Sequence, residues 1–505
     1  MTEKRRKMHA GLPEAPPELT IAVPKPGIDR KRVVLIAAGF AAFLLIYGAP
    51  PLQDAVDPAG RSIPLSREGK ASIGLLLLAA VWWIFEVVPI GVTSIAIGVF
   101  QVLFGIRPAR EAFRDFMDPS VMFIFGSVII GLAFSKTGLT KRCAYKMLEV
   151  AGERTGMILF GALALSAGLS HIMAHTAVAA TVFPVLMAIY ALYGGGEKQT
   201  NFGKALFIGM AYAASAGSIV TFFGSARAAA GAALFREFTG REIHFFELTA
   251  YLFLIGWGVV FLIWGYLVFF LKPEKKSIPG LKERVRRLAQ QLGPMTRAER
   301  FVLGIVAGTV VLMSLQPCVP ALKSVDRAAV ILSAALLFFL FRVLTVKELE
   351  DIPWNIILLI GGAVSIGFCL WKTGAAQWMA VKWLALFQNA PWLGFVFGTA
   401  LFVLVAANIL TNVVVVTISL PVSLAIAPYM GVSPDIVFYT SLVSAGMPFM
   451  LLIGTAPNAI AYESGQFTAR EFFKHGLLMS LALLVVIGVA VVILWPLLGM
   501  PVGTR

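Results

Sequence analysis

The chain carries one pattern of residues twice, once in each half. Two glycines and a Lys-Thr-Gly run in the first half, Gly126, Gly131 and 136–138, recur in the second half as Gly362, Gly367 and 372–374. At a spacing one residue larger, residues 174–176 and Pro184 correspond to residues 411–413 and Pro421. The chain therefore contains an internal duplication, and any site that it shares between its halves should lie where the two copies meet.

The duplicated unit belongs in a membrane. Of the 505 residues, 58% are hydrophobic and 14% are charged, and the mean hydropathy is +0.84. Long apolar stretches recur along the chain, for example 33–47, 73–85, 121–134, 252–271, 301–315 and 479–498. Stretches of this length predict an all-α polytopic membrane protein with about 11 transmembrane helices. Because the first 32 residues are polar and basic and no small-residue cleavage site follows, we expect the first helix to stay in place.

The net charge of +15 follows the membrane topology and does not indicate nucleic-acid binding. Basic residues gather before the first apolar stretch, at 4–7 and 30–32, and again between residues 272 and 300. The positive-inside rule places both groups in the cytoplasm, which predicts a multi-pass protein of the cell (inner) membrane with a cytoplasmic N-terminus. The segment 107–118 balances its charges, as an external loop would.

The charge pattern also predicts how the chain is divided. We expect a disordered basic tail, a first helix with an external loop, two repeats separated by a basic cytoplasmic linker, and a short C-terminal tail, at 1–31, 32–70, 71–271, 272–300, 301–498 and 499–505. An odd number of crossings in each half would make the second repeat inverted relative to the first.

Several other kinds of site receive little support from the sequence. Cys143, Cys318 and Cys369 lie far apart, without the spacing of a disulfide framework or a zinc site. His171 and His175 have the i, i+4 spacing that can hold a metal on a helix, but no acidic residue accompanies them. Glu86 is the clearest carboxylate within apolar sequence, and its position before Pro89 favours an interfacial helix end over an ion-coupling site.

Breaks in the apolar sequence are the better candidates for a site. Polar residues interrupt short apolar runs near 157–192 and near 393–428, which predicts two re-entrant hairpins with their tips inside the membrane. Small residues interrupt the helices near 204–238 and near 434–464. Unwound backbone offers carbonyl groups to a cation, and half-helix N-termini favour an anion. Kinked helices with ordinary Ser/Thr packing remain the alternative.

The sequence resembles the divalent anion:sodium symporter (DASS) family over nearly its whole length. The resemblance is carried by the Lys-Thr-Gly elements, the second hairpin tip, the second break and a Trp-Trp-x-x-Glu-x-x-Pro run, at 136–138, 372–374, 411–421, 454–458 and 82–89. It implies two inverted repeats, a homodimer of scaffold and transport domains, an elevator motion, and transport of dicarboxylates, citrate or sulfate, usually with sodium. No other cofactor, no enzyme activity and no nucleic-acid partner is implied.

In the second half the family motifs are largely retained. Thr411 and Asn412 take the places of the hairpin Ser-Asn, and Gly454 and Asn458 those of the broken-helix motif, so the resemblance implies a single sodium site at these four residues. It assigns substrate binding to Thr411, Asn412, Thr455, Ala456 and Pro457.

In the first half the motifs are altered. Ala174 and His175 replace the hairpin Ser-Asn, and only Thr176 matches. Arg227 stands where the broken helix would carry a proline, and an arginine beside a bound sodium would cost several kcal/mol. We therefore expect the first sodium site to be lost and His175, Thr176 and Arg227 to contact the substrate. The alternative is that Arg227 extends toward the external interface.

These observations together predict secondary active transport of small anions, C4-dicarboxylates above all. We expect exchange or proton coupling, with Arg227 and His175 in place of the first sodium site. Two alternatives stay open: a sodium-coupled symporter of dicarboxylate, citrate or sulfate, and, from another class, an ion antiporter or channel that uses Glu86.

Overall fold

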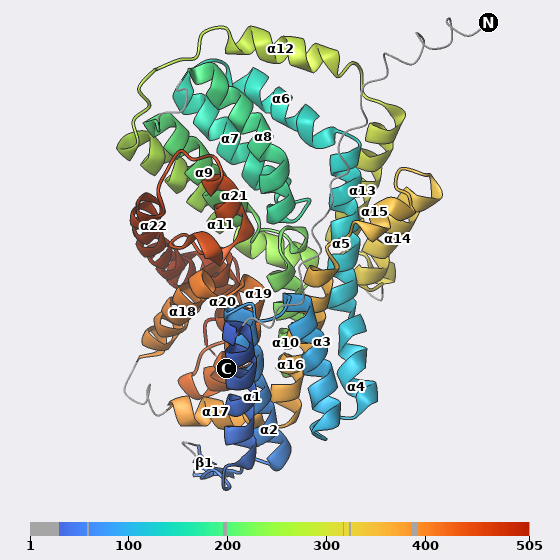
Figure 1. Cartoon of the computed structure of the whole chain (residues 1–505), viewed down its shortest axis with the longest axis vertical. Coiled ribbons are helices and arrows are strands. Elements are labelled where there is room, and N and C mark those ends of the chain that lie inside the picture. Colours follow the sequence, from blue (N-terminus) through green and yellow to red (C-terminus); the bar gives the residue numbers. More distant parts are fainter. Residues whose placement is uncertain are drawn as a thin grey trace, which may run out of the picture.

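The computed structural model describes residues 30–57, 60–194, 199–316, 318–322, 325–384 and 391–503. Nearly all of the tail expected at 1–31, and the last two residues of the chain, lie outside the described residues. Within them the chain forms helices almost throughout, which confirms the all-α prediction (Figure 1). One short antiparallel hairpin pairs β1 with β2, with Ala55 opposite Ile63.

The first half begins with helices that pack side by side and ends in a 26-residue helix, α11. Its elements are α1 (Arg30–Gly48), β1 (Ala55–Val56), β2 (Ser62–Ile63), α2 (Arg67–Ile84), α3 (Ile90–Leu103), α4 (Ala109–Arg114), η1 (Asp115–Met117), α5 (Pro119–Lys136), α6 (Leu139–Ala151), α7 (Thr155–Leu169), α8 (His175–Tyr193), α9 (Asn201–Gly217), η2 (Phe222–Gly224), α10 (Ala226–Thr239) and α11 (Phe245–Phe270).

The second half begins with the basic helix α12 and then repeats this order. Its elements are α12 (Leu281–Gln291), α13 (Arg297–Leu315), η3 (Pro320–Leu322), α14 (Arg327–Leu340), α15 (Val346–Glu350), α16 (Trp354–Lys372), α17 (Ala375–Leu384), α18 (Trp392–Ile409), α19 (Asn412–Ile426), η4 (Ala427–Met430), α20 (Pro434–Gly446), η5 (Leu452–Gly454), α21 (Ala456–Tyr462), α22 (Ala469–Val489), η6 (Ala490–Leu494) and α23 (Trp495–Leu497).

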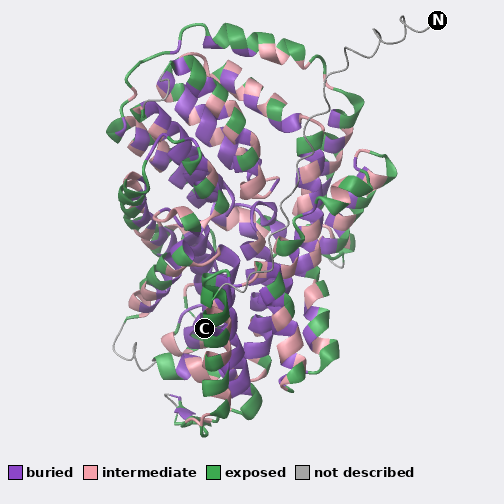
Figure 2. Cartoon of the chain, in the orientation of Figure 1, coloured by how far each residue is buried: buried purple, intermediate pink, exposed green. Residues whose placement is uncertain are grey.

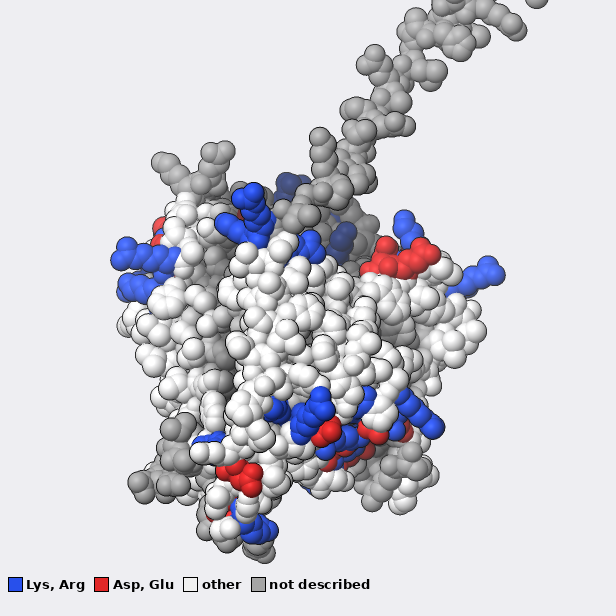
Figure 3. All heavy atoms as spheres, turned by 60° about the horizontal axis from the view of Figure 1, so that its bottom comes forward, with Lys and Arg blue, Asp and Glu red and all other residues white. Residues whose placement is uncertain are grey.

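The helices suit a membrane by length and composition. Among the described residues, nine helical stretches are long and apolar enough to cross a bilayer, and three shorter apolar helices accompany them. Charged side chains gather in two zones, and a broad uncharged belt lies between them (Figure 3). Such a belt is what the hydrocarbon core of a bilayer requires. The prediction of a polytopic membrane protein is therefore confirmed.

Contacts between helices follow the sequence repeat. The pair α3 and α16 corresponds to the pair α14 and α5, and α7 with α9 corresponds to α18 with α20. Across the halves, α8 packs against α21 and α19 packs against α10. Each hairpin therefore lies against the broken helix of the other half.

Burial identifies the helices at the centre of the molecule. Helices α9, α10, α16 and α20 are buried over most of their length, whereas α11 and α22 keep exposed apolar side chains (Figure 2). An apolar helix without a polar face is stable only inside the protein or in lipid. Here the broken helices take the inner positions.

Matching charges mark the ends of α5 and α16, where the repeated Lys-Thr-Gly runs lie. Lys136 forms an ion pair with Glu348 of α15, and Lys372 lies 3.9 Å from Glu111 of α4. The lysine and the capping hydrogen bonds of Thr345 lower the pKa of Glu348 to about 2. The repeated lysines therefore fasten each long helix to the short helix of the other half.

A turn with the same hydrogen bonds follows α3 and α14. Gly105 has φ +63°, and Arg342 occupies the corresponding place with φ +54°. The Ile106 and Val343 amides donate to Gln101 and Phe338, respectively, in equivalent bonds. The left-handed turn is thus kept in both halves, although only one copy retains glycine.

Candidate functional site

The first hairpin turns between α7 and α8, and its tip is held by hydrogen bonds. The Thr221 hydroxyl donates to the His171 carbonyl at 2.8 Å. Both ring nitrogens of His171 form hydrogen bonds. Trp257 donates to Nε2 at 3.1 Å, and Nδ1 lies 3.0 Å from the Gly217 carbonyl. A carbonyl only accepts, so Nδ1 carries the proton. His171 lies in the connection before α8, so it does not share a helix with His175.

The first broken helix is interrupted between α9 and α10, where glycines allow close approach. A Cβ at Gly217 would lie 2.4 Å from the Ala167 carbonyl oxygen, and a Cβ at Gly224 would lie 2.4 Å from the Ser170 carbonyl oxygen. No real side chain tolerates such contacts, so the break is packed directly against the hairpin tip. Ser225 then begins α10 as its N-cap.

Arg227, in the first turn of α10, is buried in this break with only 1% of its surface exposed. One terminal nitrogen donates to the Ser225 hydroxyl at 2.6 Å, and the other donates to the Ser218 hydroxyl at 2.9 Å. Among the described residues no carboxylate forms an ion pair with it. The alternative in which Arg227 extends to the interface is therefore wrong, and its charge is held in place by neutral groups.

In the second half, two asparagines hold the break in place. The side-chain oxygen of Asn408, near the end of α18, accepts from the Met450 and Leu451 amides at 2.8 and 3.0 Å. The side-chain nitrogen of Asn458 donates to the Pro448 and Leu451 carbonyls at 2.9 and 3.0 Å. Asn408 is not among the predicted site residues, although it is a lone amide in an apolar helix, and such a group needs partners when it is buried.

The donor set in the second half fits a sodium ion. The Thr411 hydroxyl and the side-chain oxygens of Asn412 and Asn458 are buried and have no hydrogen-bond partner among the described groups. Neutral oxygen atoms are the ligands that a hard monovalent cation prefers. Gly454 lies at the end of η5, where a Cβ would lie 3.3 Å from the Ala407 carbonyl oxygen of α18. In the first half Ala174, His175 and Ala228 occupy the matching positions, so the corresponding oxygens are missing.

Two contacts join the halves at the site. His175 lies with Nδ1 3.1 Å from the Gly224 carbonyl and Nε2 3.0 Å from the Thr455 hydroxyl. A Cβ at Gly446 would lie 2.7 Å from a terminal nitrogen of Arg227, so the second break touches the arginine of the first. The structure thus brings His175, Arg227 and Thr455 to the junction of the two breaks.

The other predicted residues surround this junction on half-helix starts. Thr176 follows His175 in α8, and Ala456 and Pro457 open α21. Asn412 opens α19 and Ala226 opens α10, so two helices begin at the hairpin tips and two begin at the helix breaks. Helix N-termini carry partial positive charge and free amides, and Arg227 adds a full charge. This arrangement suits a small anion. Glu86, by contrast, is exposed in the connection between α2 and α3.

Two hairpins that pack against the broken helices of the opposite half, with a buried arginine beside them, are the architecture of a polytopic transporter built from two repeats. The chain belongs to the sodium:sulfate symporter family, whose transmembrane-region model matches residues 58–501. This finding confirms the resemblance described above. The family and the relatives below are transporters, not enzymes.

Relatives in sequence agree with this assignment. The chain is 25% identical over 457 residues to the sodium-dependent dicarboxylate transporter SdcS of Staphylococcus saprophyticus, covering 86% of this chain and 87% of the relative. It is 23% identical over 455 residues to SdcS of Staphylococcus aureus, covering 85% and 86%.

Solved structures share the fold at lower identity. The YdaH transporter of Alcanivorax borkumensis superposes with a TM-score of 0.57 at 13% identity, covering 94% of this chain and 99% of the other. MtrF of Neisseria gonorrhoeae, described with a class of antimetabolite efflux pumps, superposes with a TM-score of 0.58 at 14% identity, covering 94% and 96%.

Proposed function

We propose that this chain exchanges C4-dicarboxylates across the cell membrane, with the Arg227 guanidinium in place of the first sodium ion. The observation that carries the proposal is the buried charge of Arg227, which is held by Ser218 and Ser225 and lacks a carboxylate partner in the described part of the chain. A buried unpaired charge is costly, and a carboxylate of the substrate would compensate it. The sodium-dependent dicarboxylate transporters among the relatives support the substrate class.

The fixed charge also supports exchange over net uptake. A sodium ion can leave before the empty site returns across the membrane, but the Arg227 side chain cannot. The empty site would therefore carry its charge without a counterion, whereas a loaded site carries it paired. Return with a second dicarboxylate bound is the less costly route, so internal substrate should drive uptake.

Within this mechanism His175 connects the two halves. Because the Gly224 carbonyl only accepts, His175 Nδ1 carries a proton, and in the neutral ring Nε2 accepts from the Thr455 hydroxyl. A substrate carboxylate that binds Thr455 would take over this hydroxyl hydrogen bond. Proton coupling would follow if His175 then gained a second proton and became a donor itself.

A sodium-coupled symporter is the second candidate, and one observation favours it. The unpartnered buried oxygens of Thr411, Asn412 and Asn458 form a donor set that fits one sodium ion. A single sodium there would supply positive charge beside the substrate, and Arg227 would supply the rest. Elevator motion and a homodimer, which the family resemblance implies, remain part of the proposal.

Uptake into proteoliposomes distinguishes these candidates. Labelled succinate is offered to vesicles with or without internal succinate, in sodium or potassium buffer, at two pH values. The proposal expects uptake that requires internal succinate and proceeds in potassium. Uptake into empty vesicles driven by a sodium gradient would establish the symporter instead, and uptake of no dicarboxylate under any condition would refute both.

A further inference from the structure

Ion pairs join the site helices to the surrounding helices at one end of α10. We call α7–α11 and α18–α22 the site helices, and α1–α5 and α13–α16 the frame helices. Arg236 of α10 donates to Asp118, the N-cap of α5, at 3.0 Å. Arg327 of α14 donates to Glu242 at 3.0 Å and to the Ile243 carbonyl at 2.7 Å.

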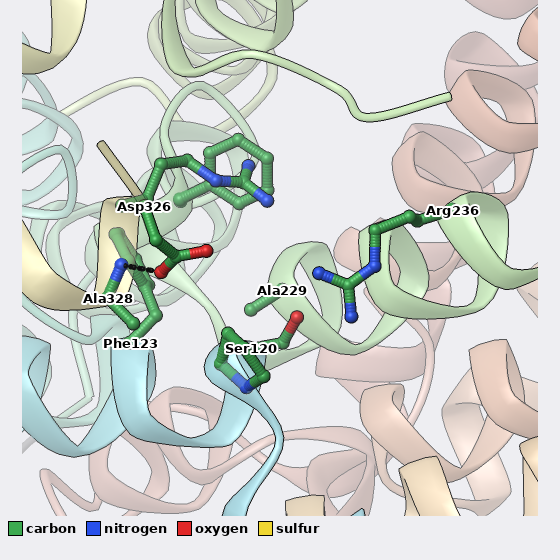
Figure 4. Close-up of a pocket in the computed structure, with 9 residues that line it drawn as sticks. Ser120, Phe123, Ala229, Arg236, Asp326 and Ala328 are labelled. Carbon is green, nitrogen blue, oxygen red and sulfur yellow. Dashed lines mark hydrogen bonds between the residues drawn. The ribbon is translucent and has the colours of Figure 1, made fainter. Parts of the chain in front are cut away.

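A third ion pair lies at the same end of α10, and an aromatic ring packs against Arg327 of the second pair. Lys372, the last residue of α16, lies 3.7 Å from Glu237 of α10. The Arg327 guanidinium also lies over the Phe222 ring, 4.5 Å from its centre. Figure 4 shows Ala229 and Arg236 of α10 facing Ser120 and the start of α14, with a narrow cavity between them.

All three pairs lie on one side of the membrane. The 26-residue α11 separates Glu242 from the basic segment that leads to α12. A helix of this length crosses the bilayer once, so the pairs lie on the face opposite α12. The positive-inside rule makes that face external.

On the α12 face, one ion pair among the described residues reaches the frame, that of Arg142 of α6 with Glu299 of α13, and it starts from a helix outside the site helices. Lys204 pairs with Glu471 within the site helices, and Lys136 pairs with Glu348 within the frame. The second repeat cannot build the matching contact, because α21 has 7 residues where α10 has 14. At 1.5 Å per residue, α21 extends about 10 Å and α10 about 21 Å.

We propose that the pairs Arg236–Asp118, Arg327–Glu242 and Lys372–Glu237 form an external gate. The gate holds α10 against the frame and favours the conformation in which the site opens toward the α12 face. This inference rests on the proposed function only in that the site helices must move relative to the frame. Because the pairs are partly exposed, each is weak alone, and they act as a set that can open in every cycle.

Cysteine labelling tests the gate without any transported substrate. Ala229, which lines the cavity behind the gate and is 3% exposed, is replaced by Cys in a background in which Cys143, Cys318 and Cys369 are Ala. A membrane-impermeant maleimide is then applied from outside. Adding Arg236→Gln and Glu242→Gln should raise the labelling rate about fivefold or more, as a shift of a two-state equilibrium requires.

The matched control is Arg241→Gln, because Arg241 pairs with Glu247 and Asp435 inside the site helices. The control should leave the labelling rate unchanged. If the double gate variant does not fold, Glu237→Gln should raise the labelling rate, whereas Glu237→Asp, which keeps the charge opposite Lys372, should label at the rate of the parent protein. Equal labelling of the parent, the folded gate variants and the control would overturn the gate, whereas absence of dicarboxylate uptake would refute only the proposed function.

Discussion

Replacing Arg227 by Gln separates a binding role from a structural one. The substitution removes the charge and the hydrogen bonds to Ser218 and Ser225, while it retains a polar, uncharged side chain that is two bonds shorter. Loss of one partner of a buried charge pair costs about 2–5 kcal/mol of binding free energy. Because the two serine hydroxyls remain to face a carboxylate, we expect the lower part of that range, about 3 kcal/mol. This free energy corresponds to an apparent affinity for succinate about 100-fold weaker.

The same substitution should weaken succinate binding without lowering the free energy of unfolding. In the protein without substrate, the Arg227 charge is buried with only neutral partners, so its removal should leave the free energy of unfolding unchanged or higher. A purely structural arginine would instead lose affinity and stability together. Arg227→Lys keeps the charge but cannot reach both hydroxyls in the same way, so we expect about tenfold weaker binding.

The assay is counterflow of labelled succinate in proteoliposomes, with thermal unfolding in detergent measured alongside. Arg241→Gln serves as the control, because it removes an arginine that is paired outside the site. An Arg227→Gln protein that binds succinate within twofold of the parent would refute the assignment. So would a variant that loses stability in proportion to affinity.

Three further predictions concern single side chains. His175→Ala should slow exchange about tenfold, because the link from the first hairpin to Thr455 is lost; initial exchange rates measure this. Arg342→Gly should raise the free energy of unfolding by about 1 kcal/mol, since φ is +54° there; thermal unfolding in detergent tests it. Glu348→Gln should reduce the pH dependence of stability, because its carboxylate, with a pKa lowered from 4.5 to about 2, stabilises the fold above pH 4.5 and loses that contribution as pH falls toward 2; thermal unfolding from pH 6 to pH 3 measures this.

Each of these predictions has a result that would contradict it. His175→Ala with unchanged exchange would show that the Thr455 contact is incidental. A lower unfolding temperature for Arg342→Gly would mean that the arginine side chain matters more than its backbone, and Gly105→Ala, with φ +63°, should destabilise as the converse change. If Glu348→Gln and the parent lose stability equally between pH 4.5 and pH 3, the pair with Lys136 contributes nothing there.

The sequence by itself determined the membrane class, the duplication and the places where helices break. These features are local: apolar runs of sufficient length must lie in lipid or in the core, and glycine, proline and polar residues interrupt helices wherever they occur. Gly217, Gly224 and Gly454 therefore marked the breaks before any contact was known. The altered first half, with His175 and Arg227, was also visible in the sequence alone.

Only the tertiary structure decided what these residues contact. Arg227 donates to Ser218, on the other side of the first helix break. The hydrogen bonds of His175 with Thr455 and of Asn408 with the Met450 amide join residues that lie far apart in the chain. The ion pairs at the end of α10 are of the same kind, because Arg236 and Asp118, and Arg327 and Glu242, lie far apart in the sequence. Periodicity and composition report which residues are buried, but the partner of a buried polar group depends on how the two halves pack across each other.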